Sequence, residues 1–206
     1  MDDRTRVAVI YYSATGTTYQ MAQAAVESAE KAGAEVRLRK VRELAPMEAI
    51  QSNEGWHAHH LETQDVPEAD LGDLEWAEAV VFGTPTRYGV MTAQLKQFID
   101  GSGPLWARGG LVNKVFAGFC STATAHGGQE ATLLSLFNVF YHWGGIVVTP
   151  GYTEPSQFVA GNPYGASHTS NNGEIPPDDT ALSATALTAR RAVWVATALR
   201  RGMAAT

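Results

Sequence analysis

Hydroxyl-bearing residues surround one glycine in the segment YYSATGTTYQ, residues 11–20. Ser13, Thr15 and Thr18 lie around Gly16, where an apolar run ends and a helical pattern begins. The segment has no lysine or arginine, so it offers hydroxyl and backbone amide donors only. Hydrogen bonds to charged groups contribute ~1.5–3 kcal/mol each, and four or five of them approach the ~12 kcal/mol of nanomolar binding. The segment therefore predicts a monophosphate site at a helix N-terminus, held without a cation.

Other nucleotide-binding loops fit this segment poorly. A P-loop requires G-x-x-x-x-G-K-[ST], and no lysine follows Gly16; a dinucleotide fingerprint requires three glycines, and one is present. A phosphoryl-signalling receiver domain needs acidic residues after the first strand, where this chain has Tyr11, Tyr12 and Ser13. The remaining alternative is an ordinary helix capped by one hydroxyl, which would account for one of the three hydroxyls.

A second segment, GTPTRYG at residues 83–89, follows another apolar run. It combines a strand-ending proline, a planar cation, an aromatic ring and a flexible glycine, in the order Pro85, Thr86, Arg87, Tyr88 and Gly89. Such residues suit a flat, electron-poor ring system that backbone groups contact at its edge. The alternative is a surface turn with incidental aromatic residues.

A third segment, FCSTATAHGGQE at residues 119–130, again passes from an apolar run through hydroxyls and small residues to a helix start. Its backbone amides are suited to the negatively charged edge of a ring, because preorganised amides stabilise developing charge. The residues between the apolar run and the helix start are Ser121, Thr122, Ala123, Thr124, Ala125, His126 and Gly127.

The three segments have a common position in the predicted fold. Five segments have strand patterns: residues 7–12, 35–41, 79–84, 114–121 and 145–149. Helical patterns with one apolar face follow Gly16, span residues 91–98 and 133–140, and close the chain at residues 181–201. This alternation predicts an α/β fold with a parallel sheet covered by helices on both faces. Ligands of such sheets bind at the carboxyl ends of the strands, where all three segments lie.

Two stretches lack clear periodicity. We expect a loop with a short helix at residues 43–73 and a long loop at residues 150–178, and long loops are often functional. His57, His59 and His60 lie in the first stretch and resemble a metal cluster, but zinc needs three or four converging ligands and no companion site is evident. We therefore expect these histidines in a solvated loop, with no metal.

Composition limits the classes of function. A chain of 206 residues that is 45% hydrophobic and 17% charged can form one domain, residues 1–206, with a sizeable core. A net charge of −6 argues against nucleic acid and anionic membranes as partners. The single cysteine, Cys120, excludes an internal disulfide and indicates a reducing compartment. No secretion signal or membrane-length apolar run is present, so we expect a cytoplasmic protein without membrane insertion.

The order of these motifs resembles the flavodoxin-like flavoproteins and, more narrowly, the tryptophan-repressor-binding-protein (WrbA) family of NAD(P)H:quinone oxidoreductases. Three further segments agree with that family: GPLWARGGLVNK at residues 103–114, YHWGG at 141–145 and GNPYGASHT at 161–169. The resemblance implies an FMN-binding, three-layer flavodoxin-like sandwich whose five-stranded sheet has the order 2-1-3-4-5. It also implies a homotetramer or homodimer.

The resemblance assigns roles to individual residues. The FMN phosphate would be held by Ser13, Ala14, Thr15, Gly16, Thr17 and Thr18. The segment from Pro85 to Gly89 would flank the isoalloxazine ring, and the segment from Ser121 to Gly127 would bind its polar edge. His142 would reach the ring in the assembled oligomer as a candidate proton donor, and Trp106 would line the slot for nicotinamide and quinone.

Two positions depart from the family pattern. Thr15 replaces an aromatic residue of well-known members, and the pair His142–Trp143 replaces a double histidine.

The implied activity is a ping-pong redox cycle. NAD(P)H would pass a hydride to FMN and leave, and a quinone would then take two electrons in the same slot. The alternatives are a flavodoxin-type electron carrier and a regulatory flavoprotein, neither with NAD(P)H activity. Trp106, the GNPYG segment and the oligomer signature are not expected of a monomeric carrier, and no basic face supports a nucleic-acid-binding regulator.

Overall fold

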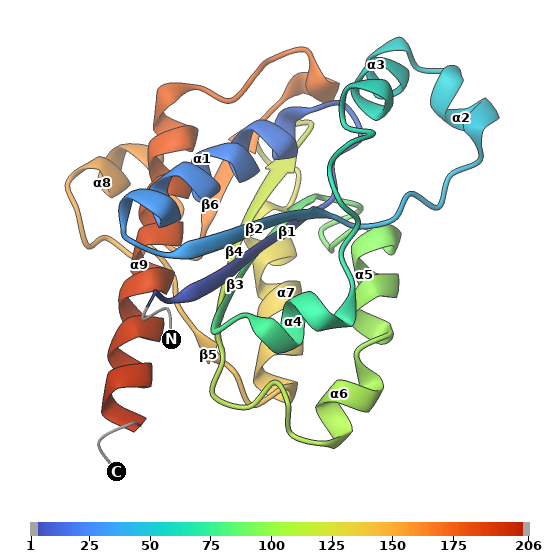
Figure 1. Ribbon diagram of the computed structural model, residues 1–206. Helices are drawn as coiled ribbons and strands as arrows, with labels where there is room; N and C mark the ends of the chain where they lie inside the picture. Colours follow the sequence, from blue (N-terminus) through green and yellow to red (C-terminus); the bar gives the residue numbers. More distant parts are fainter. Residues whose placement is uncertain (1–3, 204–206) are drawn as a thin grey trace.

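A six-stranded parallel sheet forms the centre of the computed structural model, which describes residues 4–203 (Figure 1). The main path has the order β2-β1-β3-β4-β5, as predicted, and β6 pairs separately with β4. The strands are β1 (Arg6–Tyr11), β2 (Glu35–Lys40), β3 (Ala79–Pro85), β4 (Val115–Thr122), β5 (Ile146–Val147) and β6 (Ala166–Thr169). The carboxyl ends of β1, β3 and β4 therefore lie side by side at one edge of the sheet.

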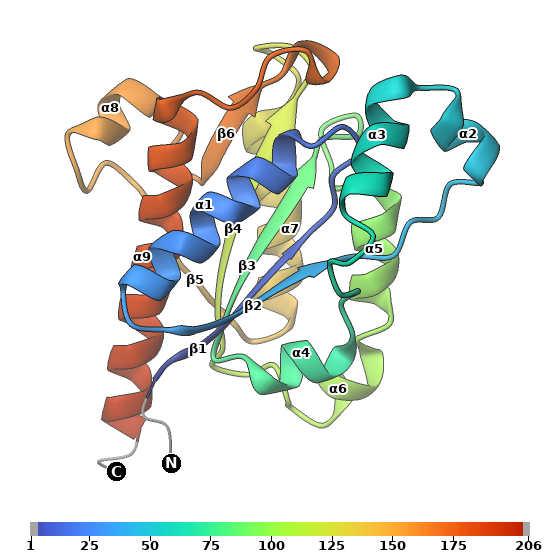
Figure 2. The same ribbon diagram turned by 45° about the horizontal axis from the view of Figure 1, so that its top comes forward.

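Helices cover both faces of the sheet (Figure 2). One face carries α1 (Thr17–Lys31) and α9 (Asp179–Met203), with α8 (Ser156–Ala160) beside α9. The other carries α4 (Leu71–Trp76), α5 (Ala93–Asp100), α6 (Gly103–Ala107) and α7 (Gln129–His142). Strand side chains alternate between the two cores, so Val7, Val9 and Tyr11 pack toward α1 and α9, whereas Ala8, Ile10 and Tyr12 pack toward the opposite helices.

Two short strands share the edge of the sheet next to β4. β5 pairs with the first part of β4, and β6 pairs with Phe119–Thr122 at its carboxyl end. The predicted strand at residues 145–149 is thus shorter in the structure. The predicted long loop at residues 150–178 is wrong, since this stretch contains α8, β6 and a 3-10 helix at Asn171–Gly173. A four-residue strand between turns is too short for its alternation to be recognised in the sequence.

The expected loop with one short helix at residues 43–73 is also wrong. The structure has three short helices in or at the end of this stretch: α2 (Met47–Gln51), α3 (Glu54–Glu62) and α4. His59 is buried on α3, where its ring packs 5.3 Å from that of Tyr19 and its Nδ1 lies 3.2 Å from Oε2 of Glu62. Burial lowers the pKa of His59. Because α3 packs through this ring and not through aliphatic side chains, the sequence shows no apolar period there.

The expectation of a solvated loop is therefore wrong for His59, while His57 and His60 are partly exposed on the same helix. Within residues 4–203, no three His, Cys, Asp or Glu side chains are grouped as metal ligands. No helix in that range is long and apolar enough to cross a membrane. Cys120 is fully buried in β4, and burial raises the pKa of its thiol.

Gly83 on β3 lies in close contact with Phe119 on β4, so a substitution at Gly83 tests how tightly the two strands pack. A Cβ at this position would lie 2.3 Å from Cζ of Phe119 on the neighbouring strand, so Gly83→Ala should lower the free energy of unfolding by about 1–3 kcal/mol through overpacking. Urea denaturation measures the change. Gly202→Ala is the control, because no atom lies within 4 Å of its added methyl group. Equal stability of both variants would contradict the described packing.

Candidate functional site

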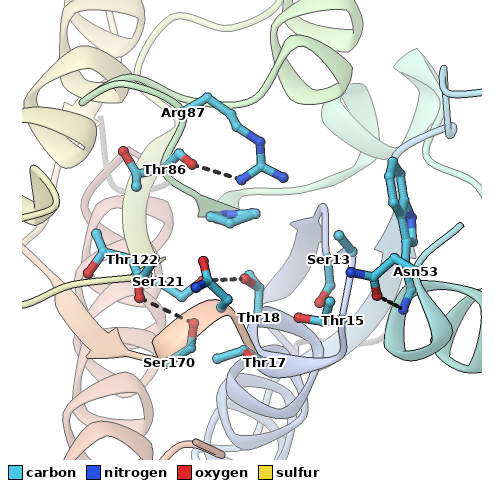
Figure 3. Close-up of a pocket in the computed structure, with 15 residues that line it drawn as sticks. Ser13, Thr15, Thr17, Thr18, Asn53, Thr86, Arg87, Ser121, Thr122 and Ser170 are labelled. Atoms are coloured by element: carbon cyan, nitrogen blue, oxygen red, sulfur yellow. Dashed lines mark hydrogen bonds between the residues drawn. The ribbon is translucent and has the colours of Figure 1, made fainter. Parts of the chain in front are cut away.

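The predicted loops meet around one cavity at the carboxyl ends of β1, β3 and β4 (Figure 3). Its volume is ≈ 320 Å³, within the range of small-molecule sites. The lining residues are Ser13, Ala14, Thr15, Thr17, Thr18, Asn53, Trp56, Pro85, Thr86, Arg87, Ser121, Thr122, Ala123, Ser170 and Asn172. Arg87 is the one cation among the described residues that line it, so most of its polar groups are hydroxyls and amides.

The loop before α1 presents free backbone donors to this cavity. Gly16 occupies the N-cap position with φ 93°, and among the described residues no side chain caps α1. Ser13 does not cap the first turn, because its Oγ accepts a hydrogen bond from Gly16 N at 3.1 Å. The ordinary capped helix is therefore excluded as an explanation for the hydroxyls. The first-turn amides of a helix have no intrahelical acceptor, and among the described residues no side chain supplies one here.

The hydroxyls at this end of the cavity are held by contacts between loops. Thr17 and Thr18 are buried, and Thr18 Oγ1 lies 3.1 Å from Ser121 Oγ on β4. This hydrogen bond links the loop after β1 to the end of β4. The donor set therefore consists of oriented hydroxyls and helix amides, which suits a monophosphate better than a metal ion.

The loop after β3 is a tight turn locked onto its neighbours. Thr86 N donates to Ser121 O at 2.8 Å, and Arg87 and Val90 exchange backbone hydrogen bonds. Tyr88 and Gly89 have positive φ values of 54° and 82°. Pro85, Thr86 and Arg87 line the cavity, whereas Tyr88 is fully exposed and neither it nor Gly89 lines the cavity.

The loop after β4 contributes its first residues to the cavity. Ser121, Thr122 and Ala123 line it, whereas the exposed residues Thr124, Ala125 and His126 do not. Gly127 packs behind this loop, where an added Cβ would lie 2.8 Å from Cβ of Thr122. The predicted contacts of residues 124–127 with a ligand stay predictions.

Four lining residues were not predicted from the sequence. Asn53 and Trp56 belong to the start of α3, and Ser170 and Asn172 belong to the turn after β6. The turn lies very close to the loop after β1, since a Cβ at Gly173 would be 2.4 Å from Thr15 Oγ1. The sequence signal for this turn is the SNNG segment at residues 170–173, because Asn and Gly favour the left-handed conformation that residues 171–173 adopt.

Trp106 and His142 lie together, but outside this cavity. Trp106 Nε1 donates to His142 O at 3.0 Å, and both residues line a separate open hollow between α6 and α7. α7 begins beside the loop after β4 and has 14 residues, so it places His142 about 20 Å along the helix from its start. Within one chain, these two residues do not join the cavity.

Glu43 is a charged group next to the cavity. Burial acts to raise the pKa of its carboxyl group, but hydrogen bonds from Ala45, Gln94, Tyr12 and Leu44 outweigh burial and lower that pKa overall. Tyr12 is buried, and its pKa is raised by burial and by its hydrogen bond to Glu43. Glu43 is therefore ionised and Tyr12 neutral near neutral pH.

Comparison with known proteins places the chain in a family. Residues 5–158 match the family model described as NADPH-dependent FMN reductase. A protein of Deinococcus radiodurans named NAD(P)H dehydrogenase (quinone) is 49% identical over 177 residues, which cover 85% of this chain and 88% of that protein. A Methylocella silvestris protein of the same name is 40% identical over 95% of this chain and 98% of its own length.

Solved structures agree with the described fold. The flavodoxin, WrbA-like protein from Agrobacterium tumefaciens matches with a TM-score of 0.63 and 26% identity, over 93% of this chain and 97% of that chain. An archaeal flavodoxin matches with a TM-score of 0.59 at 19% identity, which supports the fold alone. The resemblance and the fold predicted from the sequence are confirmed. The chain belongs to the NADPH-dependent FMN reductase family and, by its full-length relatives, to the flavodoxin-like NAD(P)H dehydrogenases (quinone).

Proposed function

We propose that this protein catalyses two-electron transfer from NAD(P)H to quinones by a ping-pong mechanism, with FMN in the cavity at the strand ends. Family membership makes the chain an oxidoreductase with FMN as its cofactor and NAD(P)H as its substrate. The observation that carries the assignment is the uncapped N-terminus of α1, which opens into the same cavity as the loops after β3 and β4.

The residues present fit FMN. The hydroxyls of Ser13, Thr15, Thr17 and Thr18 and the first-turn amides of α1 would hold its monophosphate. The other end of the cavity offers backbone of residues 85–87 and 121–123 for a flat ring. FMN supplies the redox chemistry when bound, and the protein supplies binding, orientation and electrostatics. Arg87, the one cation among the described residues that line this cavity, would act on negative charge that develops there.

We further propose that a homo-oligomer, a tetramer or a dimer, completes the site. Trp106 and His142 cannot reach the cavity of their own chain, and Trp106 is 54% exposed despite its size. Leu134 and Tyr141 are also exposed on α7. A second copy that brings this surface to the cavity would supply Trp106 to the nicotinamide and quinone slot and His142 as a proton donor. The single cysteine, which excludes an internal disulfide, supports a cytoplasmic location.

Thr18→Val should weaken FMN binding at least about 10-fold, because one hydrogen bond to a charged group contributes ~1.5–3 kcal/mol. Titration of the apoprotein with FMN, followed by quenching of flavin fluorescence, measures the dissociation constant. Thr188→Val is the matched control: this buried hydroxyl bonds to Ala184 O within α9, away from the cavity. Equal FMN affinities for both variants would remove Thr18 from the phosphate site.

NAD(P)H should bleach the flavin absorbance without a quinone, and benzoquinone should restore it. Steady-state rates with both substrates varied should give parallel double-reciprocal lines. Intersecting lines would contradict the ping-pong order. A flavin that binds but is bleached by neither NADH nor NADPH would favour the electron-carrier alternative.

Trp106→Ala should lower quinone turnover severalfold and leave FMN affinity unchanged, because Trp106 would line the nicotinamide and quinone slot and not the phosphate end of the cavity. Trp194→Ala is the matched control, since Trp194 is 56% exposed on α9. Light scattering after gel filtration should give a multiple of the monomer mass. A fully active monomer, or unchanged kinetics for Trp106→Ala, would remove Trp106 and His142 from the site.

A further inference from the structure

We propose that the indole of Trp56 is a fixed aromatic wall of the FMN cavity and that Glu43 is the positioning residue that holds it. The proposal rests on the proposed function, because it names FMN as the occupant of the cavity. It assigns a role to the segment between β2 and β3, from which the sequence predicted no site residue.

Glu43 collects hydrogen bonds from four parts of the fold. Its Oε2 accepts from Tyr12 Oη at 2.8 Å, after β1, and from Trp56 Nε1 at 3.2 Å, on α3. Its Oε1 accepts from Gln94 Nε2 at 2.8 Å, on α5, and from the backbone amides of Leu44 and Ala45. Gln94 also donates to Tyr12 Oη at 3.2 Å. One carboxylate thus ties α3 and α5 to the end of β1.

Trp56 is held at both its backbone and its ring. Asn53 caps α3 by accepting from Trp56 N at 2.9 Å through Oδ1 (Figure 3). The ring bond to Glu43 then fixes how the indole is turned about its side-chain torsions. α3 itself rests against the phosphate loop, where an added Cβ at Gly55 would lie 3.9 Å from Thr15 Cγ2. The indole therefore has one orientation relative to Ser13, Ala14 and Thr15.

The side chain of Trp56 lines the cavity and does not pack in the hydrophobic cores. Within residues 4–203, Trp56 is not among the side chains packed in or against the two hydrophobic cores, unlike Trp76 and Trp143. It is half-buried and lines the cavity with the phosphate loop and Pro85. A large aromatic side chain that is anchored by an ionised carboxylate, yet absent from the core, is placed to contact a ligand. The flat ring system and ribityl chain of FMN are the ligand surfaces available here.

Glu43→Gln separates the anchoring of Trp56 from the other contacts of Glu43. The amide oxygen of the introduced side chain would take the place of Oε1, which now accepts from the side chain of Gln94 and from the amides of Leu44 and Ala45. In the reverse orientation its NH₂ group would face these three donors and bond to none of them. In the first orientation the NH₂ group would occupy the position of Oε2 and meet the indole N–H, which is also a donor. The hydroxyl of Tyr12 can turn and accept instead. The variant therefore loses the Trp56 anchor selectively.

A double-mutant cycle on FMN affinity tests the proposal. The dissociation constants of Glu43→Gln, Trp56→Phe and the double variant are compared with that of the wild type by flavin fluorescence titration. Each single variant should weaken FMN binding about 10-fold, and the double variant should bind within about twofold of Trp56→Phe, because both changes remove one shared interaction. The circular dichroism of the bound flavin should change in the same way in all three.

Glu75→Gln and Trp76→Phe are matched controls, since Glu75 pairs with exposed Arg108 and Trp76 packs under Arg37. Both should bind FMN as the wild type does.

Two results on FMN affinity would overturn the proposal: a loss of about 100-fold in the double variant, the product of the two single losses, or unchanged affinity for Glu43→Gln. So would unchanged FMN affinity with a raised KM for NAD(P)H, which would place Trp56 against the second substrate. If Glu43→Gln does not fold, Trp56→Ala decides, and wild-type FMN affinity in that variant overturns the proposal. A wild type that binds no FMN would instead refute the proposed function.

Discussion

The uncapped N-terminus of α1 is the constraint on which the site depends. The first turn of a helix carries amide groups without intrahelical acceptors, and proteins normally satisfy them with a capping side chain or water. Here glycine occupies the cap, and the hydroxyl of Ser13 accepts from the amide of that glycine. The helix therefore leaves its donors and the positive end of its dipole facing the cavity. A bound anion would satisfy both, which couples ligand binding to the stability of this loop.

Glycine contacts bring the other two loops to the same place. A Cβ at Gly128 would lie 2.9 Å from Cα of Gly89, so the start of α7 and the turn after β3 touch backbone to backbone. Thr132 Oγ1 then donates to Thr86 Oγ1 at 2.8 Å, which fixes α7 to that turn. The loops around the cavity are thus held by the same close packing that positions the helix. A ring bound between them would meet backbone atoms whose positions the fold sets in advance.

The sequence predicted the parts of the structure that depend on periodicity and on turn chemistry. The five strands follow from apolar and alternating runs such as residues 7–12, whereas their order follows from the family resemblance. The rule for strand ends placed Ser13, Thr86 and Ser121 together. The sequence did not predict Trp56 as a cavity residue, because α3 packs through His59 and glycine contacts and has no apolar stripe. The sequence did not predict β6, because a strand of four residues between turns is too short to show an alternating pattern. The position of His142 outside the cavity follows from the direction and length of α7, and that of Trp106 from the packing of α6 beside it; three-dimensional structure alone provides both.

The packing around the loop after β1 limits how large a flavin the cavity can hold. The turn at residues 171–173 lies against Thr15 so closely that a side chain at Gly173 would collide with the Thr15 hydroxyl. α3 covers the other side of this loop through Gly55 and His59. The phosphate end is therefore enclosed on two sides, and no lysine or arginine of the loop is available for a second phosphate. A donor set of hydroxyls and helix amides balances the charge of one phosphate group, so this enclosure favours a flavin that ends at its monophosphate over one extended by a nucleotide.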